Sequence, residues 1–294
     1  MSATNSALGS RSRVPPGLRL GAVARALLPV AAAYLCLGPS LGIPSAAAED
    51  TITELYRLSG AQEAVGQYPR TLEADMAEHR EDTSPRMVRA MRTALAEAVD
   101  STRIDSTFLA RLHLVMSEAT AREGLKFLKS PTGRTVTEAE RSLNTPEGIA
   151  QMKAFLEEDI AESDPARLDL LRILDEATGS SESLANANLA MKHAIAVAFE
   201  AARPPEDRQG SDVLWALVLQ GEAQARLEAE VQTRTYYRYV YRAVTKKELR
   251  EYIDFAISET GLEYHRALNS VLSQTILDIN RGMAAVLARE LMPK

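Results

Sequence analysis

Apolar residues recur at spacings of three and four along almost the whole chain from residue 50 onward. Met87, Met91 and Leu95 form one such stripe. Ala, Leu, Glu and Arg are abundant, and no stretch shows the sustained alternation of apolar and polar residues that a half-buried strand requires. This pattern predicts an all-α protein.

Local signals mark where the helices begin. A capping side chain precedes proline at Ser84-Pro85, Ser130-Pro131, Thr145-Pro146 and Asp164-Pro165. The cap accepts a hydrogen bond from a free amide of the first turn, where proline loses nothing by lacking its own N–H. The segment from Thr245 to Glu248 has the pattern of a capping box. We expect a domain of several helices, closed by one long helix from about Leu262 to Leu291.

An internal repeat groups these helices. At an offset of 128 residues, Phe127, Ser130, Thr132 and Gly133 are matched by Phe255, Ser258, Thr260 and Gly261. The same offset pairs Ser117 with Thr245 as helix caps. It also pairs three expected core residues, Phe108, Leu112 and Val115, with Tyr236, Val240 and Ala243. We predict a tandem repeat of two diverged multi-helix units, residues 49–162 and 163–294.

A longer motif accompanies the first copy. It consists of Leu55, Leu58 and Gly60, followed some seventy residues later by Phe127, Ser130, Pro131 and Gly133. This motif resembles the bacterial domain of unknown function 2059 family. Leu128 stands where that family usually has a second aromatic residue, and the second copy has Glu259 in place of the proline. The resemblance implies a small exported helical domain and carries no activity.

Residues 1–48 have the composition of a secretory signal. Four arginines and no acidic residue occupy residues 1–25, an apolar run follows from Ala26 to Leu37, and Ala46-Ala47-Ala48 supplies a small-residue cleavage site. The run is shorter than the roughly 20 residues that cross a bilayer. A lipoprotein signal has a small residue just before its cysteine, but Leu35 precedes Cys36. A twin-arginine signal has adjacent arginines, but Ser12 separates Arg11 from Arg13. We expect export by the general secretory route to the periplasm, with no transmembrane anchor after cleavage.

Cleavage changes what the chain can bind. Loss of the four arginines takes the formal net charge from −6 to −10. A field of that sign repels phosphate backbones, so we expect no nucleic-acid partner. Cys36, the only cysteine, leaves with the signal, which excludes disulfides and thiolate chemistry from the mature protein. The expected partner is an unidentified component of the envelope.

No residue pattern indicates a cofactor or a metal. His79, His113, His193 and His265 form no close ligand pair, and no phosphate-binding loop, dinucleotide fingerprint or nucleophile elbow is present. The densest acidic cluster comprises Glu157, Glu158, Asp159, Glu162 and Asp164. It lacks the alternating oxygen ligands and glycine turn of a calcium loop. We interpret it as a solvated helix end at which Asp164 caps the next helix.

One stretch is a candidate binding site. Arg234, Arg238 and Arg242 lie four residues apart and form a basic stripe beside Tyr237 and Tyr241. Such a stripe could grip an anionic sugar, a peptidoglycan strand or a partner's carboxylates. In the alternative interpretation, which the first copy favours because it has no matching stripe, Tyr236 belongs to the core and the arginines pair with surplus acids.

The sequence therefore predicts an exported helical module of the cell envelope, with a binding or structural role and no enzymatic activity. A groove between the two units, lined by apolar residues without an acid–base pair, would favour binding. A hydrolase of envelope polymers that uses carboxylates such as Glu157 or Glu248 is one alternative. An assembly subunit that presents its long C-terminal helix to another chain is the other.

Overall fold

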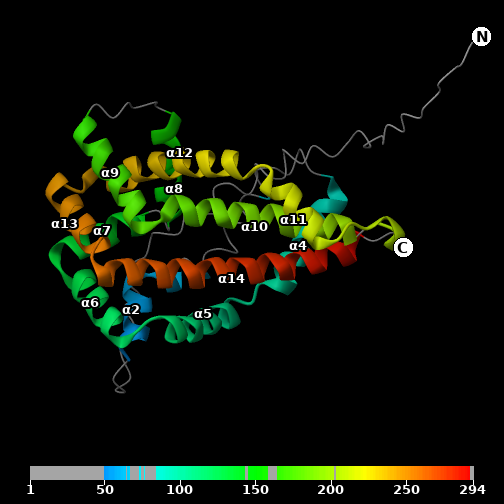
Figure 1. Cartoon of the computed structure of the whole chain (residues 1–294), viewed down its shortest axis with the longest axis horizontal. Helices are drawn as coiled ribbons and strands as arrows, with labels where there is room; N and C mark the ends of the chain where they lie inside the picture. Colours follow the sequence, from blue (N-terminus) through cyan, green and yellow to red (C-terminus); the bar gives the residue numbers. More distant parts are fainter. Residues whose placement is uncertain are drawn as a thin grey trace, which may run out of the picture.

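The computed structural model describes residues 50–63, 65, 66, 73, 76, 84–142, 145–157, 164–201 and 203–291. These residues are almost entirely helical, and no strand occurs among them (Figure 1). The all-α prediction is confirmed. The final helix, α14 (Glu259–Leu291), is the longest that the structure describes, as the sequence predicts. The expected signal, residues 1–48, lies outside the described residues, and none of the described helices is long and apolar enough to span a membrane.

Two groups of helices precede α14. The first comprises α2 (Thr51–Ser59), α4 (Pro85–Ala98), α5 (Ser101–Val115), α6 (Glu118–Lys129), α7 (Pro131–Arg141) and α8 (Pro146–Glu157). The second comprises α9 (Pro165–Thr178), α10 (Ser180–Ala201), α11 (Ser211–Leu219), α12 (Glu222–Val240) and α13 (Lys246–Ala256). Short 3₁₀ turns at Pro205–Asp207 and Tyr241–Ala243 complete the described elements.

The predicted helix starts are confirmed in their hydrogen bonds. At the four proline sites, the capping side chains accept from Met87 N, Gly133 N, Gly148 N and Ala166 N at 2.9–3.3 Å. At the fifth site, Thr245 and Glu248 form the complete capping box. Each cap satisfies an amide that the first turn would leave unpaired.

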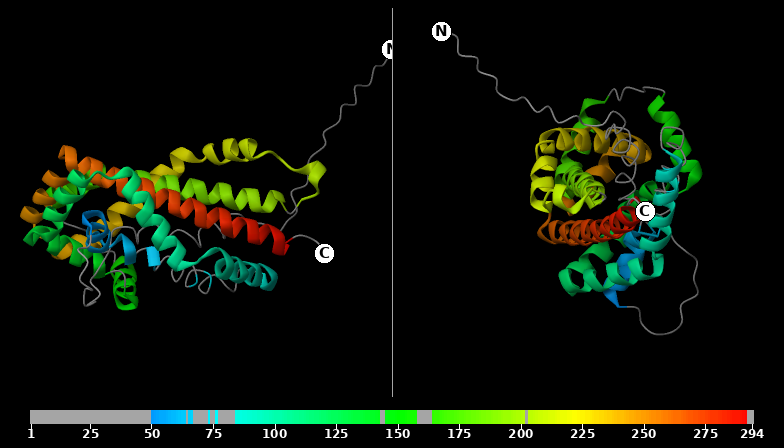
Figure 2. Two further views of the ribbon diagram at one scale, coloured as in Figure 1. Left: turned by 90° about the horizontal axis from the view of Figure 1, so that it is seen from below. Right: turned by 90° about the vertical axis from the view of Figure 1, so that its right-hand side faces the viewer.

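Helix α14 runs through the middle of the molecule and joins the two groups (Figures 1 and 2). It packs against α4, α5 and α6 of the first group and against α9, α10 and α13 of the second. Its residues from Gly261 to Ala288 are repeatedly buried on more than one face. A helix buried in this way is a core element of its own chain.

The core is divided into two main clusters, and each takes residues from both predicted units. One joins Leu55, Phe108 and Leu112 to residues of α14 that include Tyr264 and Val271. The other joins Val136 of α7 to residues of α9, α12 and α13. Phe127 and Phe255 stack between the two groups, with ring centroids 4.2 Å apart and planes 2° apart. The two predicted units therefore share their cores.

The segments that the sequence aligns have matching local geometry. A Cβ at Gly133 would lie 1.9 Å from the Phe127 carbonyl oxygen, and a Cβ at Gly261 would lie 1.8 Å from that of Phe255. Gly60 also ends α2 and Gly179 ends α9 with φ of 75° and 67°, the left-handed conformation that glycine adopts without strain.

Two expected core positions are corrected. Val115 is 53% exposed, and Ala243 is exposed as well, although helical spacing places both with the buried residues before them. Both lie in the last turn, after which the backbone becomes extended at Met116 and Val244. That change of direction turns Met116 and Val244 inward, and they are buried instead.

Candidate functional site

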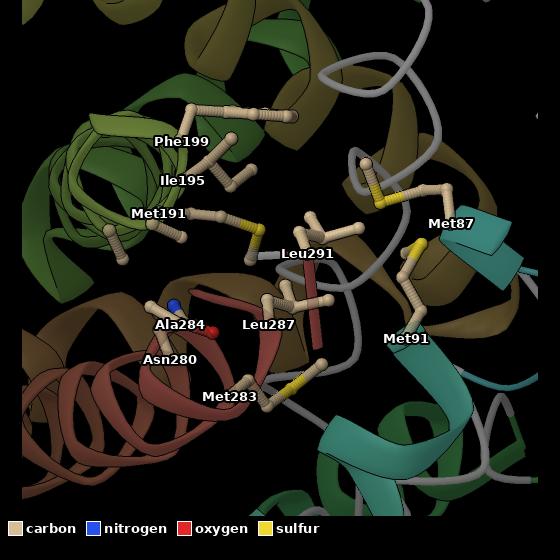
Figure 3. A pocket seen from close by; sticks show the side chains of 12 residues that line it. Met87, Met91, Met191, Ile195, Phe199, Asn280, Met283, Ala284, Leu287 and Leu291 are labelled. Carbon is tan, nitrogen blue, oxygen red and sulfur yellow. The ribbon is translucent and has the colours of Figure 1, made fainter. Parts of the chain in front are cut away.

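An apolar pocket lies between α4, α10 and α14, at the end of the molecule where α14 finishes (Figure 3). We call it the methionine pocket. Its cavity volume is about 60 Å³. Its lining residues are Met87, Met91, Met191, Ala194, Ile195, Ala198, Phe199, Asn280, Met283, Ala284, Leu287 and Leu291.

The lining is almost purely hydrocarbon and thioether. Four of the nine methionines in the sequence contribute to it, from all three helices (Figure 3). Asn280 is the one lining residue with a polar side chain, and it is buried. No lining residue carries an acid, a base or a nucleophile, so the pocket offers contact without acid–base chemistry. Water would find few partners in such a lining, which favours an apolar occupant.

Small residues let the walls approach closely. Ala194 and Ala198 of α10 meet Ala284 of α14 in a buried contact. On the other side of α14, a Cβ added to Gly282 would lie 3.1 Å from the Cβ of Ala98 in α4. The longer methionine side chains fill the space that these small residues leave.

Helix α4 is tied to the end of α14 by exposed polar contacts. Arg86 donates to the carbonyl oxygen of Leu291 at 3.0 Å, and Arg289 pairs with Glu97 at 2.8 Å. The first contact satisfies a carbonyl that the end of a helix leaves free. Exposed ion pairs contribute little stability, about 0–1 kcal/mol. Ala94 and Leu95 of α4 belong to the same buried cluster as residues of α14, so packing, and not these exposed contacts, holds the α4 wall against α14.

These properties define what the pocket can hold. An engineered apolar cavity of about 150 Å³ binds benzene, so the methionine pocket as it stands has room for a smaller apolar group. Methionine has three rotatable bonds and a polarisable sulfur, and it repacks around apolar guests of different shapes. Movement of Met87 and Met91, both only half-buried, would admit a longer hydrocarbon chain.

The tyrosines of the predicted Arg-Tyr site lie elsewhere, in the core. Tyr236 is 4% exposed, and Tyr237 and Tyr241 are 0% exposed. The Tyr237 hydroxyl donates to Ser180 at 2.8 Å, and that of Tyr241 donates to Glu140 at 2.6 Å. Tyr237 and Tyr241 therefore expose no surface in this structure, which agrees with the alternative that this stretch packs into the core.

The three arginines of that stretch do not form one open basic edge. Arg234 pairs with Glu230 at 3.3 Å, Arg238 is half-buried, and Arg242 lies 3.9 Å from the ring centroid of Tyr239. Beside Arg234, a polar hollow between α9, α10 and α12 holds acids as well as arginines, including Asp175, Glu182 and Glu230. Its mixed charge does not favour an anionic ligand.

Among the described residues, two buried carboxyl groups and one buried imidazole have shifted pKa values, and none of them lines the methionine pocket. Burial raises the pKa of Glu140 to about 8, against the effect of its hydrogen bond from Tyr241. Burial lowers the pKa of His265 to about 4, and its Nε2 atom has no hydrogen-bond partner among the described residues. Burial also raises the pKa of Asp175, which accepts a bond from the Ser181 amide at 2.8 Å.

The carboxylates considered for a hydrolase either cap helices or lie outside the described residues. Glu248 closes the capping box, and its hydrogen bonds to Thr245 lower its pKa. Asp164 caps α9 as predicted. Glu158, Asp159, Glu162 and the side chain of Glu157 lie outside the described residues. Where the structure describes side chains, no group of three His, Cys, Asp or Glu residues could hold a metal ion.

Comparisons with protein-family models, curated proteins and solved structures gave no match. The site is therefore assigned from geometry alone. The sequence shows Met87 and Met91 as part of a helical stripe, but the stripe does not show which helices face it. The nine methionines are spread along the sequence, so apart from the neighbouring Met87 and Met91 the sequence carries no signal for the pocket.

Proposed function

We propose that this chain is an exported, non-enzymatic binding protein of the cell envelope, and that the methionine pocket holds the apolar part of its ligand. The observation that carries the proposal is the lining: adaptable apolar side chains from three helices, without a titratable group. A site with few polar atoms recognises a hydrocarbon chain or ring by burial, which contributes about 25 cal/mol per Å² of apolar surface removed from water. The ligand's polar end stays outside.

Binding is better supported than hydrolysis. A catalytic carboxylate needs a substrate beside it. Of the two acids whose pKa is raised by burial, Glu140 is fully buried against Tyr241 in the core, and Asp175 is held by hydrogen bonds from Ser181. The assembly alternative is also less supported in its original form, because the long helix α14 is occupied by its own chain.

The periplasmic location remains part of the proposal. Its support is the basic, apolar and small-residue succession in residues 1–48.

We also propose that the fold derives from two copies of one helical unit, as the sequence repeat and the resemblance to the 2059 family suggest. The packing of α2 on α6 has a counterpart in α9 on α13. Helix α6 also packs on α14, and α13 packs on α7. This reciprocal arrangement, with Phe127 and Phe255 stacked between the halves, is what a pseudo-two-fold duplication would produce.

A binding assay with pocket variants tests the proposed function. The probe is n-octanol, whose hydrocarbon chain enters the pocket when Met87 and Met91 move, and titration calorimetry measures its binding. Ala198→Phe fills the pocket from α10, whereas Ala110→Phe places the same ring on the exposed face of α5 and serves as the matched control. We expect wild type and the control to bind n-octanol, and the Ala198 variant to lose binding.

A second variant covers the case in which Ala198→Phe disturbs folding. Met91→Ala enlarges the pocket from its half-buried wall, and we expect tighter binding of longer alcohols relative to octanol. Unchanged probe binding in a folded Ala198→Phe variant, or no change of chain-length preference in Met91→Ala, would contradict the proposed site.

A further inference from the structure

Helices α11 and α12 carry a second apolar feature, on the outside of the molecule. They follow one another along α10 (Figure 1). Six large apolar side chains on them are 37–57% exposed: Val213, Trp215, Leu217, Leu219, Leu227 and Val231. We call these residues the α11–α12 surface. On α5, Leu114 and Val115 are also exposed, but the other helices that the structure describes each expose fewer large apolar side chains than α11.

The composition of α11 is unusual for an exposed helix. Its sequence, SDVLWALVL, is apolar on every face after the first turn, yet Leu214 is its only fully buried residue. A helix that is apolar all round is normally covered by other protein or by lipid. Val213 and Leu217 share one face of α11, and the six side chains together expose roughly 500 Å² of apolar surface, less than the roughly 800 Å² that each partner buries in a stable interface.

The outer face of α12 continues this surface. Ala225, Ala229 and Thr233 are buried against the rest of the fold, and Leu227 and Val231 lie on the opposite face. That opposite face has the spacing of four residues that lets two helices pack along a common stripe.

Charge along α12 changes sign around that stripe. The amino-terminal part carries Glu222, Glu228 and Glu230, of which Glu222 pairs with Arg226 and Glu230 with Arg234 inside the helix, and the carboxyl-terminal part carries Arg234 and Arg238 without a further acid. Two such helices that pack antiparallel bring the acidic part of each over the basic part of the other. This charge complementarity is a property of a self-pair related by a two-fold axis.

We propose that the α11–α12 surface is the interface of a symmetric homodimer, in which α12 packs antiparallel to α12 of a second copy. Leu227 and Val231 lie at its centre, and α11 extends the contact at each end. This interface assigns part of the predicted basic stripe, Arg234 and Arg238, to contacts between copies. The proposal is independent of the methionine pocket.

Sedimentation equilibrium tests the proposal on the chain from Glu49 onward, which retains every described residue. Wild type should form a dimer, and its dissociation constant should rise with salt because the flanking contacts are ionic. The double variant Leu227→Glu, Val231→Glu should raise that constant by about 100-fold or more without changing the circular dichroism. Leu114→Glu, an equally drastic change at a residue 84% exposed on α5, should leave the dimer intact.

Cross-linking locates the interface. The predicted mature chain has no cysteine, so Val231→Cys provides a single attachment point, and Leu114→Cys is the control. A short bismaleimide should link two copies through residue 231 and not through residue 114. Three results would overturn the proposal. The first is a wild-type protein that stays monomeric at 100 μM, whether or not it binds neutral phosphatidylcholine vesicles in a flotation assay. The others are a dimer that the double variant still forms and a dimer that does not cross-link through residue 231.

Discussion

Replacement of Glu140 by glutamine should change how the stability of this protein depends on pH. Glu140 is fully buried, and burial raises its pKa from 4.5 to about 8, with Tyr241 donating a hydrogen bond to its Oε1 atom at 2.6 Å. The folded protein therefore keeps this carboxyl group protonated at neutral pH. Glutamine preserves an acceptor for Tyr241 and removes the ionisation, so the substitution isolates the cost of keeping a buried acid neutral.

The sign and size follow from proton linkage. Above pH 4.5 the unfolded chain releases the proton while the folded protein retains it up to about pH 8. Raising the pH through this interval favours the unfolded chain by about 1.4 kcal/mol per pH unit. The stability that Glu140 contributes is thus complete below pH 4.5 and lost toward pH 8, where the loss reaches about 5 kcal/mol. The neighbouring tyrosines Tyr241 and Tyr252 have pKa values raised above 10 and do not titrate there.

His265 has the opposite dependence. Because burial lowers its pKa from 6.5 to about 4, its contribution is complete above pH 6.5 and is lost as the pH falls toward 4. The two slopes oppose each other between pH 4.5 and 6.5. Wild-type stability should therefore be nearly level in that interval and should fall between pH 6.5 and 8.

Urea unfolding at half-unit intervals from pH 4.5 to 8.5 measures the effect. From pH 4.5 to pH 8.5, the unfolding free energy of Glu140→Gln should increase relative to that of wild type by about 5 kcal/mol. Glu138→Gln, on the exposed face of the same helix, is the matched control. The difference between its unfolding free energy and that of wild type should be the same at every pH. Parallel profiles for Glu140→Gln and wild type would refute the argument that Glu140 is buried in its neutral form.

Three further predictions concern packing and export. Gly133→Ala and Gly261→Ala should each lower the free energy of unfolding in urea by about 3 kcal/mol or more, because the new Cβ would overlap a carbonyl oxygen at 1.8–1.9 Å. Gly221→Ala is the control: its new Cβ would have its nearest contact at 3.6 Å, and its free energy of unfolding should stay within about 0.5 kcal/mol of wild type. Tyr236→Ala should cost about 3–5 kcal/mol, since Tyr236 is 4% exposed; a melting curve like that of wild type would refute its place in the core. Amino-terminal sequencing of the protein from its native host should begin at or near Glu49, and a product that retains residues 19–37 would contradict cleavage.

The local parts of this fold could be predicted from the sequence because their causes are local. A cap and the amide it binds lie within three residues, so Ser130-Pro131 and Asp164-Pro165 mark helix starts whatever surrounds them. The apolar spacing likewise identifies Phe108 and Leu112 as core residues. Spacing fails at Val115 because the helix ends there, and an extended Met116 turns inward in its place.

The site could not be predicted because its residues meet only in the tertiary fold. Met91, Met191 and Met283 lie on helices far apart in the sequence, and no short motif links them. The packing of the Arg-Tyr stretch likewise depends on the tertiary fold. Alternating tyrosines and arginines indicate a binding face when the helix is exposed, but α12 turns Tyr237 into the core and pairs Arg234 with Glu230.

Methionine methyl NMR shows whether the methionine pocket binds an apolar ligand. In the chain from Glu49 onward, labelled with ¹³C at the methionine methyl groups, the resonances of Met87, Met91, Met191 and Met283 should shift together and saturate as n-octanol is added. Met116 and Met152, which do not line the pocket, are internal controls and should stay in place. We expect saturable shifts that are confined to the four pocket methionines. Shifts spread evenly over all the methionines, or saturable shifts at Met116 and Met152 alone, would contradict it.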